Sequence, residues 1–340
     1  MKELLKKLTD LDGIAGYEDE VREFIENEIK DHVDEMFTDP MGNLYAFKKG
    51  AKRREKKLLV SAHMDEVGFL VHSITEDGML KLSQVGGIDP RVLVGRRMKA
   101  GHKKVNGIIS IKAIHLTTPE ERKVAPSLGS LYVDIGSSSK KQTEEYVRVG
   151  DPVYFDSAFV EFGDNRIKAK AIDDRLGCAM MIEIIKGDLE YDTWFGFSVQ
   201  EEIGIRGARV LGNRVNPDIS LVLEGTTAAD LPNVALHAQA CAQGKGGVIS
   251  LIDGKTVYDR EIREPILKKA DEEGIKWQYK TAGTGANDNG AIHIAKDGCM
   301  AFGLSAPLRY IHSAANVLYW PDAEEMFKMA KLFIKESGAL

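Results

Sequence analysis

The chain has one long interruption in an otherwise regular alternation of helical and extended patterns. Between about residues 67 and 164, short apolar runs are separated by glycine-rich turns, as at Gly86 and Gly136. Short strands at that spacing are typical of a small all-β unit. On either side of it, apolar residues recur at helical spacing or form continuous strand-like runs, which is typical of a mostly parallel sheet with helices on both faces.

The length supports two domains, because 340 residues exceed the roughly 100 to 200 residues of one typical domain. We therefore predict an α/β fold in which residues 1–66 and 165–340 form the helix-covered, mostly parallel sheet. Residues 67–164 are predicted to form an inserted, barrel-like β domain.

The composition argues against several classes of protein. The net charge is −6, and the one dense basic run, Lys48–Lys57, lies between two strand-like segments without interleaved aromatic residues. We interpret that run as a solvated hairpin turn and expect no nucleic-acid partner. Three cysteines without a CxxC spacing argue against both a disulfide framework and a thiolate zinc site.

The apolar runs also bear on location. Lysines and leucines are mixed at helical spacing from Met1 to Leu11, and no run of about 18 apolar residues occurs, the length that a membrane span requires. We therefore expect neither a secretory signal nor contact with a membrane, and a cytoplasmic protein.

Three strand-like runs are followed by residue types that bind metals. In open α/β sheets ligands bind beyond the carboxyl ends of the strands, so such positions carry information about function. Taken singly, each has an ordinary explanation as a structural histidine, a solvated acidic turn or a strand-end carboxylate. The residues concerned are His63 and Asp65 after the first run, Glu201 and Glu202 after the second, and Glu224 after the third.

Two further motifs add to this set. Asp173 and Asp174 stand at the start of a predicted helix, where capping the helix is an adequate alternative role. His312 supplies a second histidine late in the chain. Imidazole and carboxylate groups without cysteine suit zinc, cobalt or manganese rather than calcium or an iron–sulfur cluster. Two histidines with three or four of these carboxylates make at least five ligands, which exceed the needs of one tetrahedral ion but suit a pair of ions about 3.5 to 4 Å apart.

In this order, the motifs resemble the TET family of dinuclear metallo-aminopeptidases, which also contains glutamyl aminopeptidases and proteins labelled endoglucanases. The resemblance extends over essentially the whole chain and includes Gly13–Glu18 near its start. It implies a hydrolase that removes N-terminal residues from short peptides through attack by a metal-bridging hydroxide. It also implies two divalent ions per subunit, zinc first and cobalt or manganese as alternatives.

The resemblance assigns a role to each candidate residue. One metal would be held by His63 and Glu224, the other by Glu202 and His312, with Asp173 bridging them. The general base would be Glu201, Asp65 would orient His63, and the bond between Asp173 and Asp174 would be cis. The inserted domain would form homo-oligomers, from dimers up to tetrahedral dodecamers.

The chain departs from the family pattern in two places. Many relatives carry aspartate where this chain has Glu224, and residues 284–290 are less regular than the usual glycine-threonine-aspartate turn.

Two other functions stay open. One is glycoside hydrolysis, which needs an acid and a base carboxylate on either side of a sugar. The other is a non-catalytic metal-binding scaffold, which would have no need of an unligated carboxylate such as Glu201.

Overall fold

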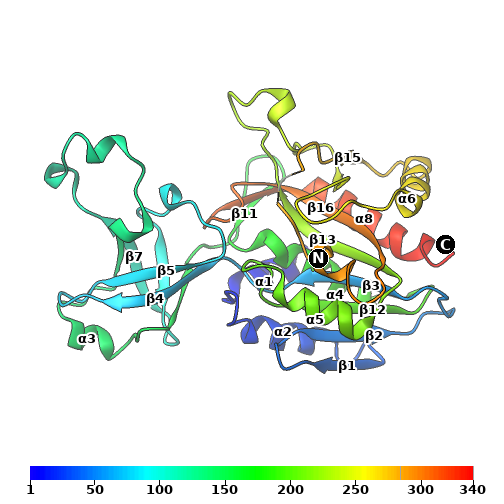
Figure 1. Cartoon of the computed structure of the whole chain (residues 1–340), viewed down its shortest axis with the longest axis horizontal. Helices are drawn as coiled ribbons and strands as arrows, with labels where there is room; N and C mark the ends of the chain where they lie inside the picture. Colours follow the sequence, from blue (N-terminus) through cyan, green and yellow to red (C-terminus); the bar gives the residue numbers. More distant parts are fainter. Residues whose placement is uncertain (284, 340) are drawn as a thin grey trace.

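The protein consists of two lobes joined side by side (Figure 1). The structure, a computed structural model, describes residues 1–283 and 285–339. The larger lobe contains both ends of the described chain, and the smaller one, drawn in cyan and teal, is formed by the middle of the sequence. The predicted α/β fold with an inserted β barrel is confirmed.

Eleven of the described strands form the sheet of the larger lobe. Their bounds are β1 Glu35–Thr38, β2 Leu44–Lys48, β3 Leu58–His63, β10 Val160–Phe162, β11 Arg166–Ala169, β12 Thr193–Ser198, β13 Ile219–Thr227, β14 Gly247–Ile249, β15 Trp277–Tyr279, β16 Met300–Arg309 and β17 Asn316–Tyr319. The order is β1-β2-β12-β3-β13-β16-β17-β11-β10, and β14 joins β15 to β16 beside this path.

Parallel pairing is limited to part of this sheet. The central strands β12, β3, β13 and β16 run parallel to one another, as do β14 and β15, whereas β1, β2, β17, β11 and β10 pair antiparallel. The prediction of a mostly parallel sheet therefore describes the centre and not the edges. The centre matters for function, because the carboxyl ends of its four strands meet at one edge of the sheet.

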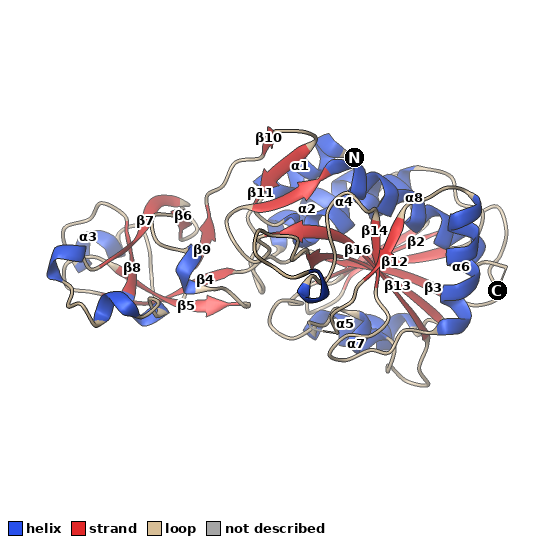
Figure 2. Ribbon diagram, turned by 90° about the horizontal axis from the view of Figure 1, so that it is seen from above, coloured by secondary structure: helices blue, strands red, loops and turns tan. Residues whose placement is uncertain are grey.

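Helices cover both faces of the sheet (Figure 2). The helices are α1 Lys2–Asp10, α2 Asp19–Ile29, α4 Ile172–Lys186, α5 Arg206–Val215, α6 Arg260–Glu272, α7 Asn289–Ile292 and α8 Trp320–Glu336, with α3 Lys140–Glu144 in the smaller lobe. One face packs against α1, α2, α4, α6 and α8, and the other against α5 and α7.

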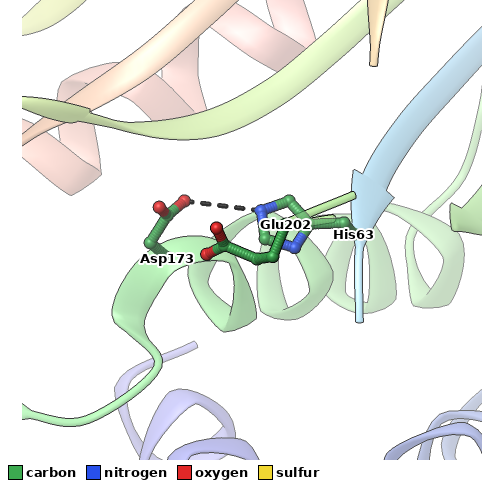
Figure 3. Close-up of side chains that lie close together, drawn as sticks. All are labelled: His63, Asp173 and Glu202. Atoms are coloured by element: carbon green, nitrogen blue, oxygen red, sulfur yellow. Dashed lines mark ion pairs between the residues drawn. The ribbon is translucent and has the colours of Figure 1, made fainter. Parts of the chain in front are cut away.

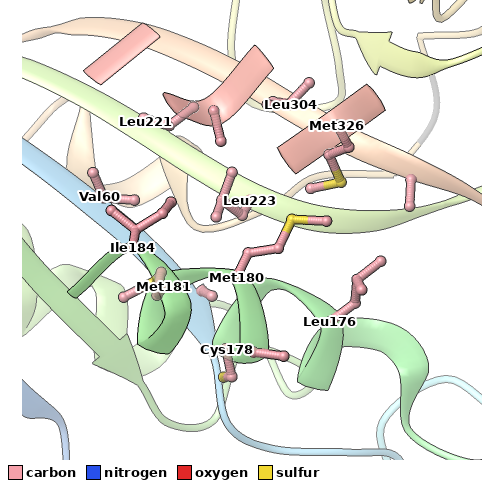
Figure 4. Packing of buried hydrophobic residues seen from close by; sticks show 14 of the residues in the cluster. Val60, Leu176, Cys178, Met180, Met181, Ile184, Leu221, Leu223, Leu304 and Met326 are labelled. Carbon is pink, nitrogen blue, oxygen red and sulfur yellow. The ribbon is translucent and has the colours of Figure 1, made fainter. Parts of the chain in front are cut away.

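The position of β3 between two layers of helices explains why its sequence is apolar without alternation. Val60 packs on the α4 side, in the cluster that Figure 4 shows, whereas Leu59 packs on the α5 side. Both side chains are fully buried. A strand covered on both faces needs apolar residues at every position, which is the pattern that the sequence has.

The smaller lobe is a closed barrel of six strands, β4 Gly68–Ile74, β5 Leu80–Val85, β6 Arg97–Ala100, β7 Val105–Ile111, β8 Leu131–Asp134 and β9 Pro152–Phe155. All its pairs are antiparallel. The barrel ends earlier than the predicted boundary at residue 164. Although β10 lies within residues 67–164, it pairs with β11 and belongs to the large sheet.

The basic run Lys48–Lys57 is not a hairpin turn. It connects β2 to β3, but β12 lies between these two strands in the sheet, so the segment crosses over an intervening strand. Its charges are partly neutralised locally, since Lys49 pairs with Asp34 and Lys52 pairs with Glu190.

Among the described residues, no helix combines the length and hydropathy that crossing a membrane requires.

A buried network of charges joins the N-terminal segment to the end of β3 and to β11. The Lys170 ammonium lies 2.6 Å from Glu66 Oε1 and 3.1 Å from Asp12 Oδ1, and all three side chains are at most 3% exposed. The fully buried Arg175 donates to the carbonyl oxygens of Leu8 and Met64. Buried charges are tolerated only when they are paired and hydrogen-bonded, so these contacts depend on one another.

Replacing Lys170 by Met should therefore destabilise the protein strongly, because it leaves two buried carboxylates without their shared cation. We expect a loss of about 3 to 5 kcal/mol in the free energy of unfolding, measured by denaturant titration. The control is Lys52→Met, which removes an exposed ion pair with Glu190 and should cost at most about 1 kcal/mol. Equal losses in the two variants would contradict the prediction.

Candidate metal centre

The carboxyl edge of the central strands gathers the predicted site residues. His63 is the last residue of β3, and Glu202 follows the end of β12. Glu224 lies within β13, which continues four residues beyond the predicted strand end at Leu223, to Thr227. After the end of β16 comes His312, and Asp173 lies at the start of α4, which packs below these strands.

These five side chains lie close together. His63 Nε2 is 3.0 Å from Glu224 Oε1. It is 3.6 Å from Asp173 Oδ1, the ion pair that is dashed in Figure 3. His312 Nε2 is 3.3 Å from Glu202 Oε2 and 3.6 Å from Asp173 Oδ2. The two oxygens of Asp173 thus face different histidines, which is the arrangement that a carboxylate shared between two ions requires.

The start of α4 gives its two aspartates different surroundings. The peptide bond between them is cis, as the resemblance implied. Asp174 Oδ1 accepts a hydrogen bond of 3.0 Å from the Gly177 N–H, so the alternative role as a helix cap applies to Asp174. Asp173 Oδ1 accepts one of 3.2 Å from the Gly225 N–H, beside Glu224.

The surroundings of Asp65 differ from the prediction. His63 Nδ1 makes its shorter contact, 3.0 Å, with the Asp65 carbonyl oxygen, while the Asp65 carboxylate is 3.5 Å away. That carboxylate instead accepts hydrogen bonds from the backbone N–H groups of Glu201, at 2.9 Å, and Glu202, at 3.1 Å. The side chain of Asp65 therefore holds the loop after β12, and its backbone fixes the histidine ring.

The barrel lobe also reaches the cluster. The backbone of Gly86, which follows β5, adopts a positive φ of 81°, and a Cβ added there would lie 3.3 Å from Glu202 Cβ. A Cβ added at the neighbouring Gly87 would lie 3.6 Å from His312 Nδ1. Two glycines thus allow the barrel backbone to approach the side chains at one end of the cluster closely.

The cluster contains more acid than its two imidazoles can neutralise. Burial raises the pKa of Glu202 to about 7, and it raises the pKa of Glu224 well above the usual range. Burial lowers the pKa of His312, but Asp173 and Glu202 outweigh burial and raise that pKa to about 9. In His63, too, carboxylates led by Glu224 outweigh burial and raise the pKa. A bound cation would compensate the excess of negative charge.

The donor set fits divalent ions. Among the described residues, two groups offer ligand atoms within 4.8 Å of one another: His63 with Asp173 and Glu202, and His63 with Asp174 and Glu224. The buried atoms Glu224 Oε2 and Asp174 Oδ2 have no hydrogen-bond partner in the part of the chain that the structure describes. Such orphaned oxygens cost about 1 to 3 kcal/mol each, which coordination of a metal would relieve. Nitrogen and oxygen donors suit zinc, cobalt or manganese.

The sequence prediction missed two acids near the centre. One is Asp174, whose place in the second ligand group was not predicted. The other is Asp288, which is 1% exposed, accepts a short hydrogen bond from Ser198 Oγ, and has its pKa raised to about 6 by burial. The signal for Asp288 was its place in residues 284–290, of which Thr284 lies outside the described residues.

Comparison with known proteins places this centre in a family. A family model described as M42 glutamyl aminopeptidase matches residues 42–329. The chain belongs to the M42 family. A putative aminopeptidase from Acetivibrio thermocellus is 35% identical over 331 residues, which cover 97% of each chain.

Solved structures agree with M42 membership. A TET aminopeptidase from a marine sediment archaeon of the Thaumarchaeota superposes with a TM-score of 0.94 at 32% identity, over 99% of this chain and 98% of the other. A TET1 peptidase from Pyrococcus horikoshii, described as able to assemble into a tetrahedron or a large octahedral shell, superposes with a TM-score of 0.86 at 33% identity, over 98% and 99% of the two chains. The M42 fold thus extends over the whole described chain.

Adding zinc, cobalt or manganese ions to chelator-treated protein should raise its thermal unfolding midpoint, because the ligand cluster exists only in the folded state. An ion at 100 times its dissociation constant should stabilise the protein by about 2.7 kcal/mol.

Two isosteric variants test which carboxylates are involved. Asp173→Asn should reduce the metal-induced shift, whereas Glu201→Gln should keep it, since Glu201 belongs to neither ligand group among the described residues. Differential scanning fluorimetry with and without metal measures both shifts. The assignment is wrong if Asp173→Asn keeps the full shift.

Proposed function

We propose that the protein is a metal-dependent aminopeptidase, which removes N-terminal residues from short peptides. M42 membership supports the reaction class. The observation that carries the metal dependence is the position of Asp173, whose two oxygens each lie 3.6 Å from a different histidine. Two divalent ions bound there would polarise the scissile carbonyl and lower the pKa of a bound water towards neutrality.

The distances support the ligand assignment in this proposal. His63 and Glu224 would hold one ion, Glu202 and His312 would hold the other, and Asp173 would be shared between them. The presence of Asp174 in the second ligand group provides a further oxygen next to His63 and Glu224. The side chain of Glu224 brings its Oε1 to 3.0 Å from His63 Nε2.

The proton transfers fall to Glu201 in this proposal. Burial, with Asp288 and Glu202 nearby, raises the pKa of Glu201 well above the usual range, and His63 opposes this rise. A carboxylate with a raised pKa is a better proton acceptor near neutral pH. Glu201 accepts a proton from the attacking water and passes it to the leaving nitrogen, so that the C–N bond breaks to release a neutral amine.

No feature of the described cluster favours glycoside hydrolysis over this reaction. A glycosidase needs two carboxylates that flank a sugar, about 5 to 9.5 Å apart. Here the two candidate carboxylates, Glu201 and Glu202, are adjacent in the chain. Glu202 also lies 3.3 Å from His312, within the proposed metal cluster.

Replacing Glu201 by Gln should abolish turnover and leave both metals bound. The amide cannot accept the proton, so kcat should fall by about 10² to 10⁴. The assay is release of nitroaniline from aminoacyl-nitroanilides, with metal content measured on the same samples, and wild-type activity should disappear with chelator. Full activity in the variant would refute this role, and release of sugar from cellulose by the wild type would refute the reaction class.

The same proposal includes assembly of the chain into homo-oligomers through the barrel. The related Pyrococcus horikoshii peptidase assembles into closed shells. In this chain the barrel segment between β7 and β8 exposes Ile114, Leu116 and Val124 by 72%, 61% and 72%. Exposed apolar side chains grouped on one segment are typical of contact surfaces.

The native mass, measured by size-exclusion chromatography with light scattering, should therefore be at least twice the 37.5 kDa mass of one chain. The variant Ile114→Asp should shift the protein toward smaller species, because a carboxylate in an apolar contact is costly. Glu120→Asp on the same exposed segment is the control. A monomeric wild type would contradict the proposal.

A further inference from the structure

The motif Gly13–Glu18 ends in a carboxylate that is only 4% exposed. Glu18 stands just before α2, where a side chain commonly caps the helix. Its carboxylate makes no such bond, and its carbonyl oxygen accepts from the Val21 and Arg22 N–H groups instead. Glu18 Oε1 accepts a hydrogen bond of 2.9 Å from Gly16 within the motif and, in addition, one from a distant segment.

That distant segment is the loop carrying Glu201. Glu18 Oε1 accepts a hydrogen bond of 3.1 Å from the Gln200 N–H. Asp65 accepts from the next two N–H groups, those of Glu201 and Glu202. Two buried carboxylates from separate parts of the chain thus bind three consecutive backbone N–H groups, and they leave this loop little freedom to shift.

The conformation of Gln200 makes such support necessary. Its φ is 57°, in the left-handed region that residues other than glycine rarely adopt. A strained conformation persists only where the surrounding contacts hold it. The strained residue Gln200 lies where β12 has ended and the chain turns toward Glu201. The hydrogen bond to Glu18 therefore holds the residue that sets the direction of the turn.

We propose that Glu18 is a positioning residue for Glu201, acting through the backbone of Gln200. This role rests on the proposed function, because it presupposes that Glu201 transfers protons. Glu18 suits a test better than Asp65 does, since Asp65 lies beside the His63 ring as well. Substitution of Glu18 therefore changes the support of the loop while the Asp65 contacts to His63 remain.

The test compares kcat, KM and metal content in four proteins, each loaded with excess metal and corrected for the folded fraction. Glu18→Ala removes the acceptor and should lower kcat by up to about 100-fold, the effect of a displacement near 1 Å, with KM and metal content unchanged. Glu18→Gln keeps an acceptor oxygen of the same reach and should retain most of the wild-type kcat. Glu23→Ala, on an exposed position of α2, is the control and should match the wild type.

A purely structural role predicts a different result. In that case Glu18→Ala lowers the thermal midpoint, while kcat per folded molecule stays at the wild-type value, and this outcome would overturn the proposal. If Glu18→Ala does not fold, Glu18→Met fills the same space without an acceptor and must show the same loss of kcat. A large loss of kcat in Glu18→Gln would also overturn it. An inactive wild type would refute the proposed function itself.

Discussion

The centre of this protein depends on the balance of charge among the acids and imidazoles that meet at one edge of a sheet. Each oxygen of Asp173 faces a different histidine, and Glu202 and Glu224 lie against the same two rings. Without a cation, burial raises the pKa of both glutamates, so the site stores unfavourable electrostatic energy. The parallel strands hold these acids together in spite of this repulsion, as the proposed binding of divalent ions requires.

Much of this arrangement could be predicted, since it depends on local patterns. A continuous apolar run that ends in His63 indicates both a buried strand and a residue at its carboxyl edge. The roles that depend on three-dimensional neighbours could not be predicted in the same way. The Asp65 carboxylate binds the N–H groups of Glu201 and Glu202, and no pattern near Asp65 reveals that partner. The position of Asp288 next to Ser198 likewise depends on how distant segments pack.

The errors at domain level have a similar cause. The end of the barrel was placed too late because β10 is a short, exposed strand whose membership is decided only by its pairing with β11. The basic run Lys48–Lys57 was predicted as a hairpin because two strands flank it in the sequence. The insertion of β12 between those strands comes from a segment that lies far along the chain, which local spacing does not encode.

The placement of the barrel within the chain has a consequence for the order in which the protein forms on the ribosome. The barrel is complete at Phe155, before β12, β13 and β16 have been made. Domains generally fold as units during synthesis, the earlier ones first. The barrel can therefore fold while β3 still lacks both of its neighbours in the sheet. The strand that ends in His63 must wait for the later half of the chain, and during this interval its apolar residues on both faces lack the sheet neighbours that bury them.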